Sequence, residues 1–332
     1  MLRTALSLSC ITGKGFRICN IRKARSKPGL MRQHLVAVQV CAQISAAEVA
    51  GDQLSSEELT FVPRRVVPGD YSFDIGTAGS IPLVLQTIIP ALLVAGRAGS
   101  ITLTGGTHVP FSPSWHYLSE VFARALSRLG VKLELTLERC GFYPKGGGKV
   151  HCRVQPAGSL AALTAEQRGK LLRVSGCSVV AHLPLSIAER QARSARAVLE
   201  AGLGNGVPIE ITVRELPAFR PGTFIFLKGE YESAVSGFTA LGALGKPAER
   251  VGEEAAHELV SHDKSGMALD PHLADQLVLY LARAKGRSVF TTSRLSSHLE
   301  TNLLVTGRFL DVGWQLDGER DGPGRVVITP MP

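Results

Sequence analysis

The chain has 332 residues, of which 45% are hydrophobic and 20% are charged, and its formal net charge is +9. This composition is typical of a soluble globular protein with room for one large domain or two. The apolar runs fall short of the roughly 20 residues that a membrane-spanning helix requires, which excludes an integral membrane protein.

Positive charge is concentrated at the amino end. The first acidic residue is Glu48, and the 47 residues before it carry +8 of the total of +9. An acid-free segment with Arg and Ser is also typical of a mitochondrial transit peptide. However, Pro28 can start a helix, and an apolar stripe at helical spacing follows it at Leu30, Leu35, Val38, Cys41 and Ile44. We therefore favour a folded basic surface that attracts a polyanion.

Three stretches of the chain show the same order of predicted elements. The first has helices and strands at 1–13, 16–22, 28–44 and 59–63. The second adds a leading strand and a glycine turn, and its elements are expected at 70–75, 76–80, 81–95, 100–106, 115–130 and 131–138. The third is predicted at 272–286, 287–292, 296–310 and 312–317. Because the first stretch begins at its helix, we expect its leading strand and glycine loop to be missing from this chain.

A different order of elements interrupts this pattern between the second and third stretches. Strands and helices are predicted there at 171–183, 187–203, 208–216, 223–230 and 249–260. The sequence thus predicts an α+β protein with a large domain formed by 1–168 and 265–332. Residues 169–264 are predicted to form a smaller inserted α+β domain that packs as a separate lobe.

The six cysteines are widely separated, with no C-x-x-C pair and no Cys/His spacing of the kind that binds zinc. We expect reduced thiols in a cytoplasmic protein, most of them acting as small buried hydrophobic residues.

Five motifs occur in a fixed order along the chain: "KPGLMRQHL", "GTAGSIPLVLQTIIPAL", "RCGFYPKGGGKV", "HLADQL" and "SSHLETN". Together they resemble the RNA 3′-terminal phosphate cyclase family, from Met1 to about residue 312. The resemblance implies a large domain of three repeated βαβαβ-type units, each with two helices on a sheet, and a smaller inserted domain of thioredoxin-like type. It also implies an ATP-dependent ligase that converts an RNA 3′-terminal phosphate to a 2′,3′-cyclic phosphodiester.

The resemblance also implies roles for particular residues. His298 matches the nucleophile that attacks the α-phosphate of ATP and becomes a covalent histidine-AMP. The adenylate then passes to the RNA, giving RNA-(3′)pp(5′)A, and the 2′-hydroxyl displaces AMP. The positions implied to bind ATP are Gln86, His272, Leu273, Ala274, Asp275 and Gln276. Those implied to line the pocket for the RNA end are Arg3, Arg22, Arg25, Gln33 and His34. Mg²⁺ or Mn²⁺ is the implied metal, and no residue is assigned to it.

The chemistry is reasonable for these residue types. Imidazole is largely neutral near pH 7 and has a free lone pair, and cations stabilise a transferring phosphoryl group. Ordinary structural roles remain open: Asp275 could be a charge favoured by a helix dipole, and Arg22 and Arg25 could form a solvated face. Gln86 is a more specific indication of a binding site than these residues, because it lies in an apolar helix and a buried amide needs hydrogen-bond partners.

The glycine run at 146–148 has two interpretations. Ordering three glycines is costly, because each loses more backbone freedom than any other residue. They could form a backbone turn beside the nucleotide or the RNA end, with Lys145 adding charge. They could instead form only a tight hairpin between the strands on either side.

The sequence departs from the family pattern at Cys140, Ser114 and His272. In addition, the family carries a glutamate that helps to hold the metal in the leading loop expected to be missing here. Two other functions stay open: a non-catalytic ribosome assembly protein of the same fold, which lacks the nucleophilic histidine, and a repeat-built synthase for small anionic metabolites. His298 and "FYPKGGG" favour the enzyme. RNA 3′ ends are the expected partner, with no membrane and no stable protein partner.

Overall fold

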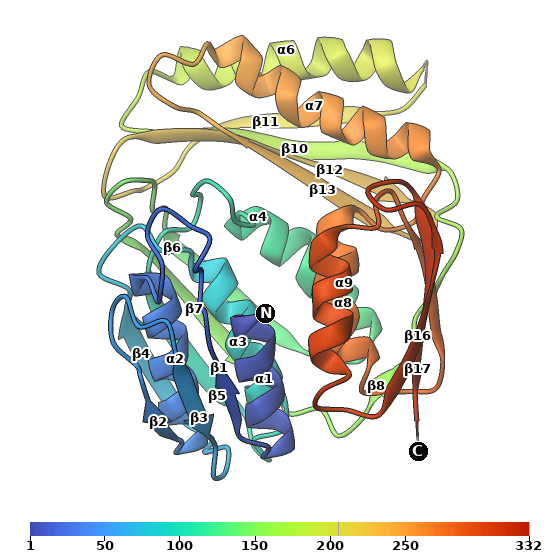
Figure 1. Ribbon diagram of the computed structural model, residues 1–332. Coiled ribbons are helices and arrows are strands. Elements are labelled where there is room, and N and C mark those ends of the chain that lie inside the picture. The colour runs from blue at the N-terminus through green and yellow to red at the C-terminus, as the bar shows by residue number, and fades with distance from the viewer. Residues whose placement is uncertain (205, 332) are drawn as a thin grey trace.

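The computed structural model describes residues 1–204 and 206–331 as a mixed α/β protein with several sheets. A smaller layer built from residues 171–265 lies above a larger body, whose helices gather between sheets at its left and right (Figure 1). In the described part of the chain, every helix is too short or too polar to cross a membrane.

The amino-terminal part of the body has a three-stranded antiparallel sheet with two helices. Its elements are α1 (Leu2–Thr12), β1 (Phe16–Ile18), α2 (Arg32–Ser45), β2 (Glu48–Ala50) and β3 (Leu59–Val62), with strand order β1-β3-β2. The expectation that Pro28 starts a helix was wrong. Gly29 has a left-handed φ of +75°, and the Leu30 N–H donates a hydrogen bond to the Ser56 carbonyl oxygen. This turn delays the start of α2 until Arg32.

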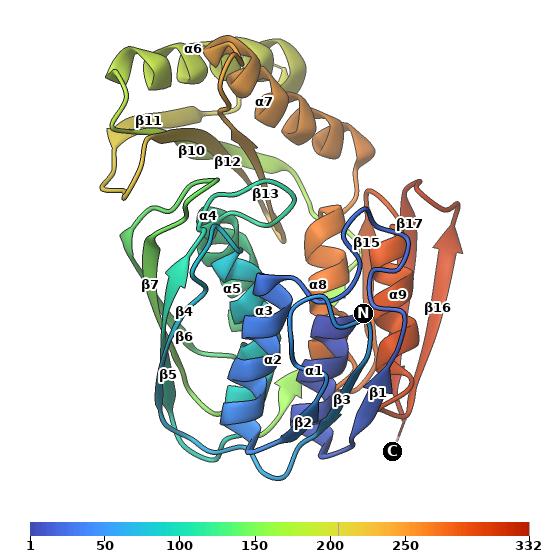
Figure 2. The same cartoon turned by 60° about the vertical axis from the view of Figure 1, so that its left-hand side comes forward.

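A four-stranded sheet follows next along the chain and lies at the left edge of the body in Figure 2. Its strands β4 (Asp70–Asp74), β5 (Gly99–Gly105), β6 (Leu133–Arg139) and β7 (Gly148–Val154) are ordered β4-β5-β7-β6. Helix α3 (Ile81–Leu93) follows β4, and Ser80 caps it by accepting a hydrogen bond from the Leu83 N–H. The helix predicted at 115–130 is continuous from Trp115 to Arg128 but is π-helical in its middle, so it is divided into α4 (Trp115–Tyr117), η1 (Leu118–Phe122) and α5 (Ala123–Arg128).

The carboxyl-terminal part of the body has a sheet of the same strand number. It contains β9 (Thr164–Ala165), β15 (Ser288–Thr292), β16 (Val312–Gly318) and β17 (Gly324–Pro330), in the order β16-β17-β15-β9. A parallel pair, β8 (Leu160–Ala161) and β14 (Ala284–Lys285), lies beside it in the sequence. Its helices are α8 (Pro271–Leu281) and α9 (Ser297–Thr306).

The upper layer is a sheet covered by two helices. The strands are β10 (Leu171–Ala181), β11 (Ile209–Glu215), β12 (Gly222–Tyr231) and β13 (Val235–Leu241), in the order β11-β10-β12-β13. Helices α6 (Leu185–Leu203) and α7 (Ala248–Ser265) cover the face that points away from the body (Figure 2). The opposite face contacts the body, where the Phe224 ring stacks on His108 at 3.9 Å between ring centroids.

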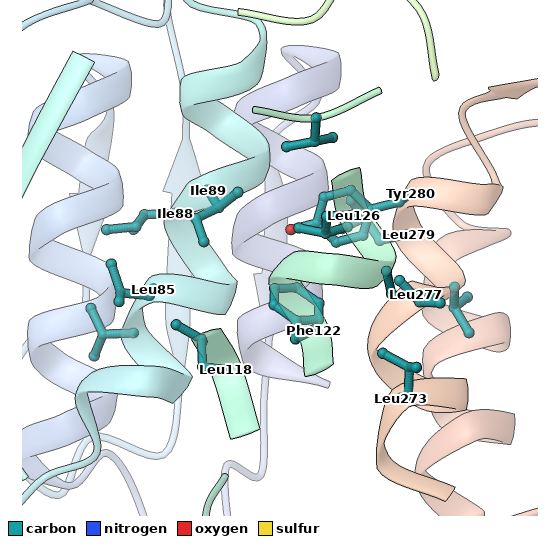
Figure 3. Packing of buried hydrophobic residues seen from close by; sticks show 14 of the residues in the cluster. Leu85, Ile88, Ile89, Leu118, Phe122, Leu126, Leu273, Leu277, Leu279 and Tyr280 are labelled. Atoms are coloured by element: carbon teal, nitrogen blue, oxygen red, sulfur yellow. The ribbon is translucent and has the colours of Figure 1, made fainter. Parts of the chain in front are cut away.

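The main core brings together helices from distant parts of the chain. Leu85 and Ile88 of α3, Phe122 of η1, and Leu277 and Tyr280 of α8 are buried in it (Figure 3). The Phe122 and Tyr280 rings meet edge to face, with centroids 5.9 Å apart. Burial of each large apolar side chain contributes about 1.5–3 kcal/mol, so these contacts hold the helices in place. The sequence neighbours of these core residues are thereby positioned for a site.

The cysteines agree with the expectation from the sequence. All six are free, five of them are buried, and Cys19 is exposed.

Candidate active site

A cavity of about 110 Å³ lies among helices α1, α3, α8 and α9. Five residues singled out from the sequence line it together, although they come from four helices and from nearly opposite ends of the chain. The lining residues are Met1, Arg3, Thr4, Ser7, Gln86, Thr87, Pro90, Phe122, Asp275, Gln276, Leu279, Tyr280, His298 and Asn302.

His298 lies in the first turn of α9. Ser296 caps this helix, because its hydroxyl accepts a hydrogen bond of 3.2 Å from the Leu299 N–H. Partial burial lowers the pKa of His298, and the positive charges of Arg3 and Arg294 act in the same direction. The imidazole is therefore neutral at pH 7 and keeps a lone pair for nucleophilic attack.

Side-chain hydrogen bonds tie the helices around the cavity to one another. The Thr4 hydroxyl donates to Asn302 Oδ1 at 2.7 Å, and Asn302 Nδ2 donates to the Asp275 carbonyl oxygen at 3.0 Å. The Ser7 hydroxyl donates to the Thr87 carbonyl oxygen at 2.7 Å. Asn302 thus connects α1, α8 and α9. Sequence reasoning missed this residue, although it stands four positions after His298 in the same motif and so on the same face of α9.

Several buried polar atoms at the cavity lack a hydrogen-bond partner within the described chain. They are Gln86 Nε2, Gln276 Oε1 and Tyr280 Oη. A buried polar group without a partner costs about 1–3 kcal/mol, so such groups are usually satisfied by something else. One donor, one acceptor and one hydroxyl around a single cavity fit a polar ligand such as a nucleotide.

The charges of the cavity favour an anion. Burial raises the pKa of Asp275 to about 7, and the Arg3 guanidinium opposes this increase. Burial also lowers the pKa of Arg3, whereas Asp275 raises it. Because an arginine stays protonated even so, the cavity combines a full positive charge with a carboxyl group that is only half ionised near neutral pH.

The start of α8 forms one edge of the site. Asp270 caps this helix, and its Oδ1 accepts hydrogen bonds of 3.0 Å from the backbone N–H groups of His272 and Leu273. The same oxygen accepts a bond of 2.8 Å from the Tyr117 hydroxyl. The His272 side chain is exposed, whereas the side chains of Leu273 and Ala274 belong to the core. If these two residues contact a nucleotide, they do so through their backbone.

The other residues predicted to bind the RNA end lie next to the cavity, around the start of α2. Gln33 Oε1 accepts a hydrogen bond of 3.0 Å from the Ser80 N–H, and His34 Nδ1 accepts one of 3.2 Å from the Met31 N–H. Burial lowers the pKa of His34 to about 4, and Arg3 and Arg22 contribute to this decrease. Arg25 is exposed. Arg3 therefore acts on both His34 and His298.

The glycine run forms the end of a hairpin. Strands β6 and β7 pair antiparallel on either side of it. Gly146 and Gly147 have φ angles of +71° and +73°. A Cβ on Gly146 would lie 2.5 Å from the Thr77 carbonyl oxygen, and one on Gly147 would lie 2.8 Å from the Phe219 side chain. Close packing of loops therefore accounts for these glycines, and a role beside the nucleotide stays a prediction.

The described residues form no group of three or more His, Cys, Asp or Glu side chains that could hold a metal ion. Asp275 is the one carboxylate side chain among the residues that line the cavity in this part of the chain. These residues alone do not fit a divalent cation, and we derive no step through one.

Comparison with known proteins gives consistent matches. A family model described as RNA 3′-terminal phosphate cyclase matches residues 1–316. The RNA 3′-terminal phosphate cyclase of Methylococcus capsulatus is 47% identical over 319 residues, which cover 93% of this chain and 87% of the relative. The proteins of the same name from Caldivirga maquilingensis and Methanopyrus kandleri are 46% and 42% identical, over 94% and 99% of this chain and 89% and 95% of theirs.

Proposed function

The chain belongs to the RNA 3′-terminal phosphate cyclase family, and from this premise we propose that it converts an RNA 3′-terminal phosphate to a 2′,3′-cyclic phosphodiester at the expense of ATP. One observation carries this proposal: His298 shares a cavity with Arg3, Gln86, Asp275 and Gln276. A neutral imidazole, a cation and polar atoms free to bind a ligand meet there.

In the first step, His298 attacks the α-phosphorus of ATP. A P–N bond forms, the bond between the α-phosphorus and the bridging oxygen breaks, and pyrophosphate leaves with the bonding electrons. The lowered pKa of His298 keeps the imidazole unprotonated for this attack. Arg3 stabilises the negative charge of the phosphoryl group in transfer.

In the next two steps, the adenylate is transferred and the ring closes. An oxygen of the RNA 3′-phosphate attacks the phosphorus of histidine-AMP, which gives RNA-(3′)pp(5′)A and restores the imidazole. The vicinal 2′-hydroxyl then attacks the 3′-phosphorus, loses its proton and expels AMP. The anhydride makes this displacement possible, because AMP is a far better leaving group than an oxide. The substrate is RNA, because DNA has no 2′-hydroxyl.

The residues that hold the substrates are part of the proposal. Gln86, Gln276 and Asp275 bind ATP from the cavity wall, and His272, Leu273 and Ala274 bind it at the start of α8. The RNA phosphate is bound by the basic side chains Arg3, Arg22 and Arg25, together with Gln33 and His34. If about four positively charged side chains contact RNA phosphates, the logarithm of the binding constant for single-stranded RNA falls with the logarithm of the salt concentration with a slope near −2.8.

The architecture supports a repeat origin. The sheets with strand orders β4-β5-β7-β6 and β9-β15-β17-β16 have the same connections, and β1-β3-β2 matches their last three strands. We infer three repeated βαβαβ-type units in a domain of 1–168 and 265–332, with a thioredoxin-like domain inserted at 169–264. The free cysteines support a reducing compartment, and we propose the cytoplasm.

Intact-protein mass spectrometry tests the function. Incubation with ATP and Mg²⁺ or Mn²⁺ is expected to add roughly 329 Da, which is AMP less water. His298→Asn is expected to abolish the adduct, whereas His257→Asn, a change at an exposed histidine of α7, leaves it intact. A wild-type protein without the adduct would support the non-catalytic ribosome assembly reading, and we would then withdraw the mechanism.

A further inference from the structure

Three aromatic side chains lie exposed on loops of this protein. Phe111, Tyr143 and Phe219 have relative exposures of 105%, 70% and 57%. The other aromatic side chains in the described ranges are buried or partly buried. A single exposed apolar side chain is ordinary, but large exposed rings grouped on neighbouring loops indicate a binding surface.

The loops that carry these rings adjoin one another, because bridges join His108 to Phe142 and Cys140 to Ala218. They border one cavity of about 630 Å³, which is separate from the cavity at His298. Tyr143 lines this cavity, and so do Pro110 and Pro221, which lie within two residues of Phe111 and Phe219. Most of the other wall residues are apolar, among them Phe142, Leu183, Ile187 and Leu241. These loops and their rings are called the aromatic rim: Tyr143 lies at the wall of a mostly apolar hollow, and Phe111 and Phe219 lie on the loops beside it.

Phe219 is held in place by its neighbours. The Cys140 N–H donates to the Pro217 carbonyl oxygen at 2.7 Å, and His182 Nε2 lies 2.8 Å from the Ala218 carbonyl oxygen. The side chain itself packs against Gly147, where a Cβ would lie only 2.8 Å away. The ring is thus preorganised for binding, which reduces the entropy lost when a ligand stacks on it.

Positive charges accompany the rings. The guanidinium carbon of Arg220 lies 5.3 Å from the centroid of the Phe219 ring, and Lys145 is exposed two residues after Tyr143. Exposed aromatic faces beside Arg and Lys are the combination that binds single-stranded nucleic acid, because bases stack on the rings and phosphates contact the cations. A purely hydrophobic partner would not need these charges.

The rim is continuous with the residues proposed to bind the RNA end. Gln33 holds the Ser80 N–H at 3.0 Å, and the loop that precedes Ser80 contains Thr77. A Cβ on Gly146 would lie 2.5 Å from the Thr77 carbonyl oxygen, and the next residue, Gly147, packs on Phe219. Two adjoining loops therefore connect the RNA-end residues to the aromatic rim.

We propose that the nucleotides immediately 5′ of the RNA end bind on this rim, with their bases stacked on Tyr143, Phe219 and Phe111 and their phosphates in contact with Lys145 and Arg220. The proposal rests on the proposed cyclase function and extends its RNA site beyond the terminal nucleotide. Stacking accepts any base, so the contact adds affinity for longer RNA without selecting a sequence.

Binding measurements with RNAs of two lengths test the proposal. The probes are a single 5′-fluorescent uridylate with a 3′-phosphate and a ten-nucleotide oligouridylate with the same two end groups. Tyr143→Ala and Phe219→Ala are expected to weaken binding of the longer probe by about 5- to 100-fold and to leave binding of the mononucleotide unchanged. Tyr143→Phe and Phe219→Tyr retain a ring and retain the affinity. Leu54→Ala, a change at another exposed apolar side chain, serves as the matched control.

Salt dependence tests the cations separately. Lys145→Gln and Arg220→Gln are each expected to reduce the magnitude of the salt slope for the longer probe by about 0.7, whereas Arg97→Gln leaves it unchanged. Equal affinity of the wild-type protein for both probes, or equal weakening of both by the ring variants, would overturn the proposal.

Adenylation distinguishes this proposal from the function on which it rests. The histidine-AMP adduct forms without RNA, so the ring variants are expected to form it at the wild-type level, which also shows that they are folded. A protein that forms the adduct but binds both probes equally keeps its function and loses the aromatic site. A protein that forms no adduct loses the proposed function, whatever its affinity for the longer probe.

Discussion

The two cavities of this protein differ in how their walls are built. The cavity at His298 is small, its lining side chains come from helices, and hydrogen bonds such as that between Thr4 and Asn302 connect those helices. The cavity beside Tyr143 is larger, mostly apolar, and formed to a great extent by loops. Covalent chemistry needs atoms held within a fraction of an ångström, and packed helices provide this. A surface that binds RNA of any sequence needs only exposed aromatic side chains on which bases can stack.

Replacement of His298 is the strongest test of this contrast. His298→Asn is expected to reduce adenylation by at least about 1,000-fold, because the nucleophile is lost, and to leave the melting temperature nearly unchanged, because the side chain is exposed. The adduct is measured by mass spectrometry and unfolding by calorimetry. Retention of the adduct would show that another residue is the nucleophile.

The core between the helices gives the next largest effect. Phe122→Ala is expected to lower the free energy of unfolding by about 3–5 kcal/mol, because it opens a void beside Tyr280 in the main core. Phe111→Ala changes the same residue type at a fully exposed position and is expected to change stability by less than about 0.5 kcal/mol. Urea titration measures both. Similar losses would mean that the Phe111 loop is packed more firmly than its exposure indicates.

The loop beside the aromatic rim provides an intermediate effect. Gly146→Ala is expected to destabilise the protein by about 2 kcal/mol or more, because the residue has a positive φ and its Cβ would meet the Thr77 carbonyl oxygen. Gly96 has a similar φ of +78°, but a Cβ added there would meet open space. Gly96→Ala therefore measures the destabilisation from the backbone conformation alone, which is about 1 kcal/mol. Equal losses for the two variants in urea titration would contradict close packing of the loop.

The smallest effect concerns the charge in the helical cavity. The pKa of Asp275 is raised to about 7 in the folded state, so protonation favours folding below that value. The stabilisation from the protonated Asp275 carboxyl group is complete at pH values below the pKa that this group has in the unfolded chain. It is lost as the pH rises through 7. Between pH 6 and 8, wild-type stability is expected to fall by on the order of 1 kcal/mol relative to Asp275→Asn, measured by urea titration at each pH. Parallel pH profiles would show that the carboxyl group is well solvated.

Much of the fold could be predicted from local signals. The starts of helices α3 and α8 were expected within one residue of where they lie, since Ser80 and Asp270 are good caps and a proline follows each at the start of the helix. The end of α8 was placed five residues too late, because the chain leaves the helix at Leu281 and enters the short strand β14. Strands β13 and β17 were missed. Val235–Leu241 buries consecutive residues instead of alternating, and Gly324–Pro330 ends in a proline, so neither has the pattern of an isolated strand.

The candidate site depended on information that spacing does not contain. Arg3, Gln86 and His298 are far apart in the chain, and their meeting in one cavity was anticipated only through the resemblance to a family. The contributions of Asn302 and Tyr280 arise from contacts with other helices, such as the bond from Asn302 to the Asp275 carbonyl oxygen. Helical periodicity places these side chains on a face but does not say what that face meets.

The hydrogen bonds that Asn302 accepts from Thr4 and donates to the Asp275 carbonyl oxygen also bear on biosynthesis. A ribosome delivers α1 well before α9, at about 5–20 residues per second, so during the interval between them the nascent chain lacks the wall that carries His298. The basic amino-terminal segment leaves the ribosome long before His298 does. The cavity at His298 can therefore form only after α9 has emerged and docked against α1.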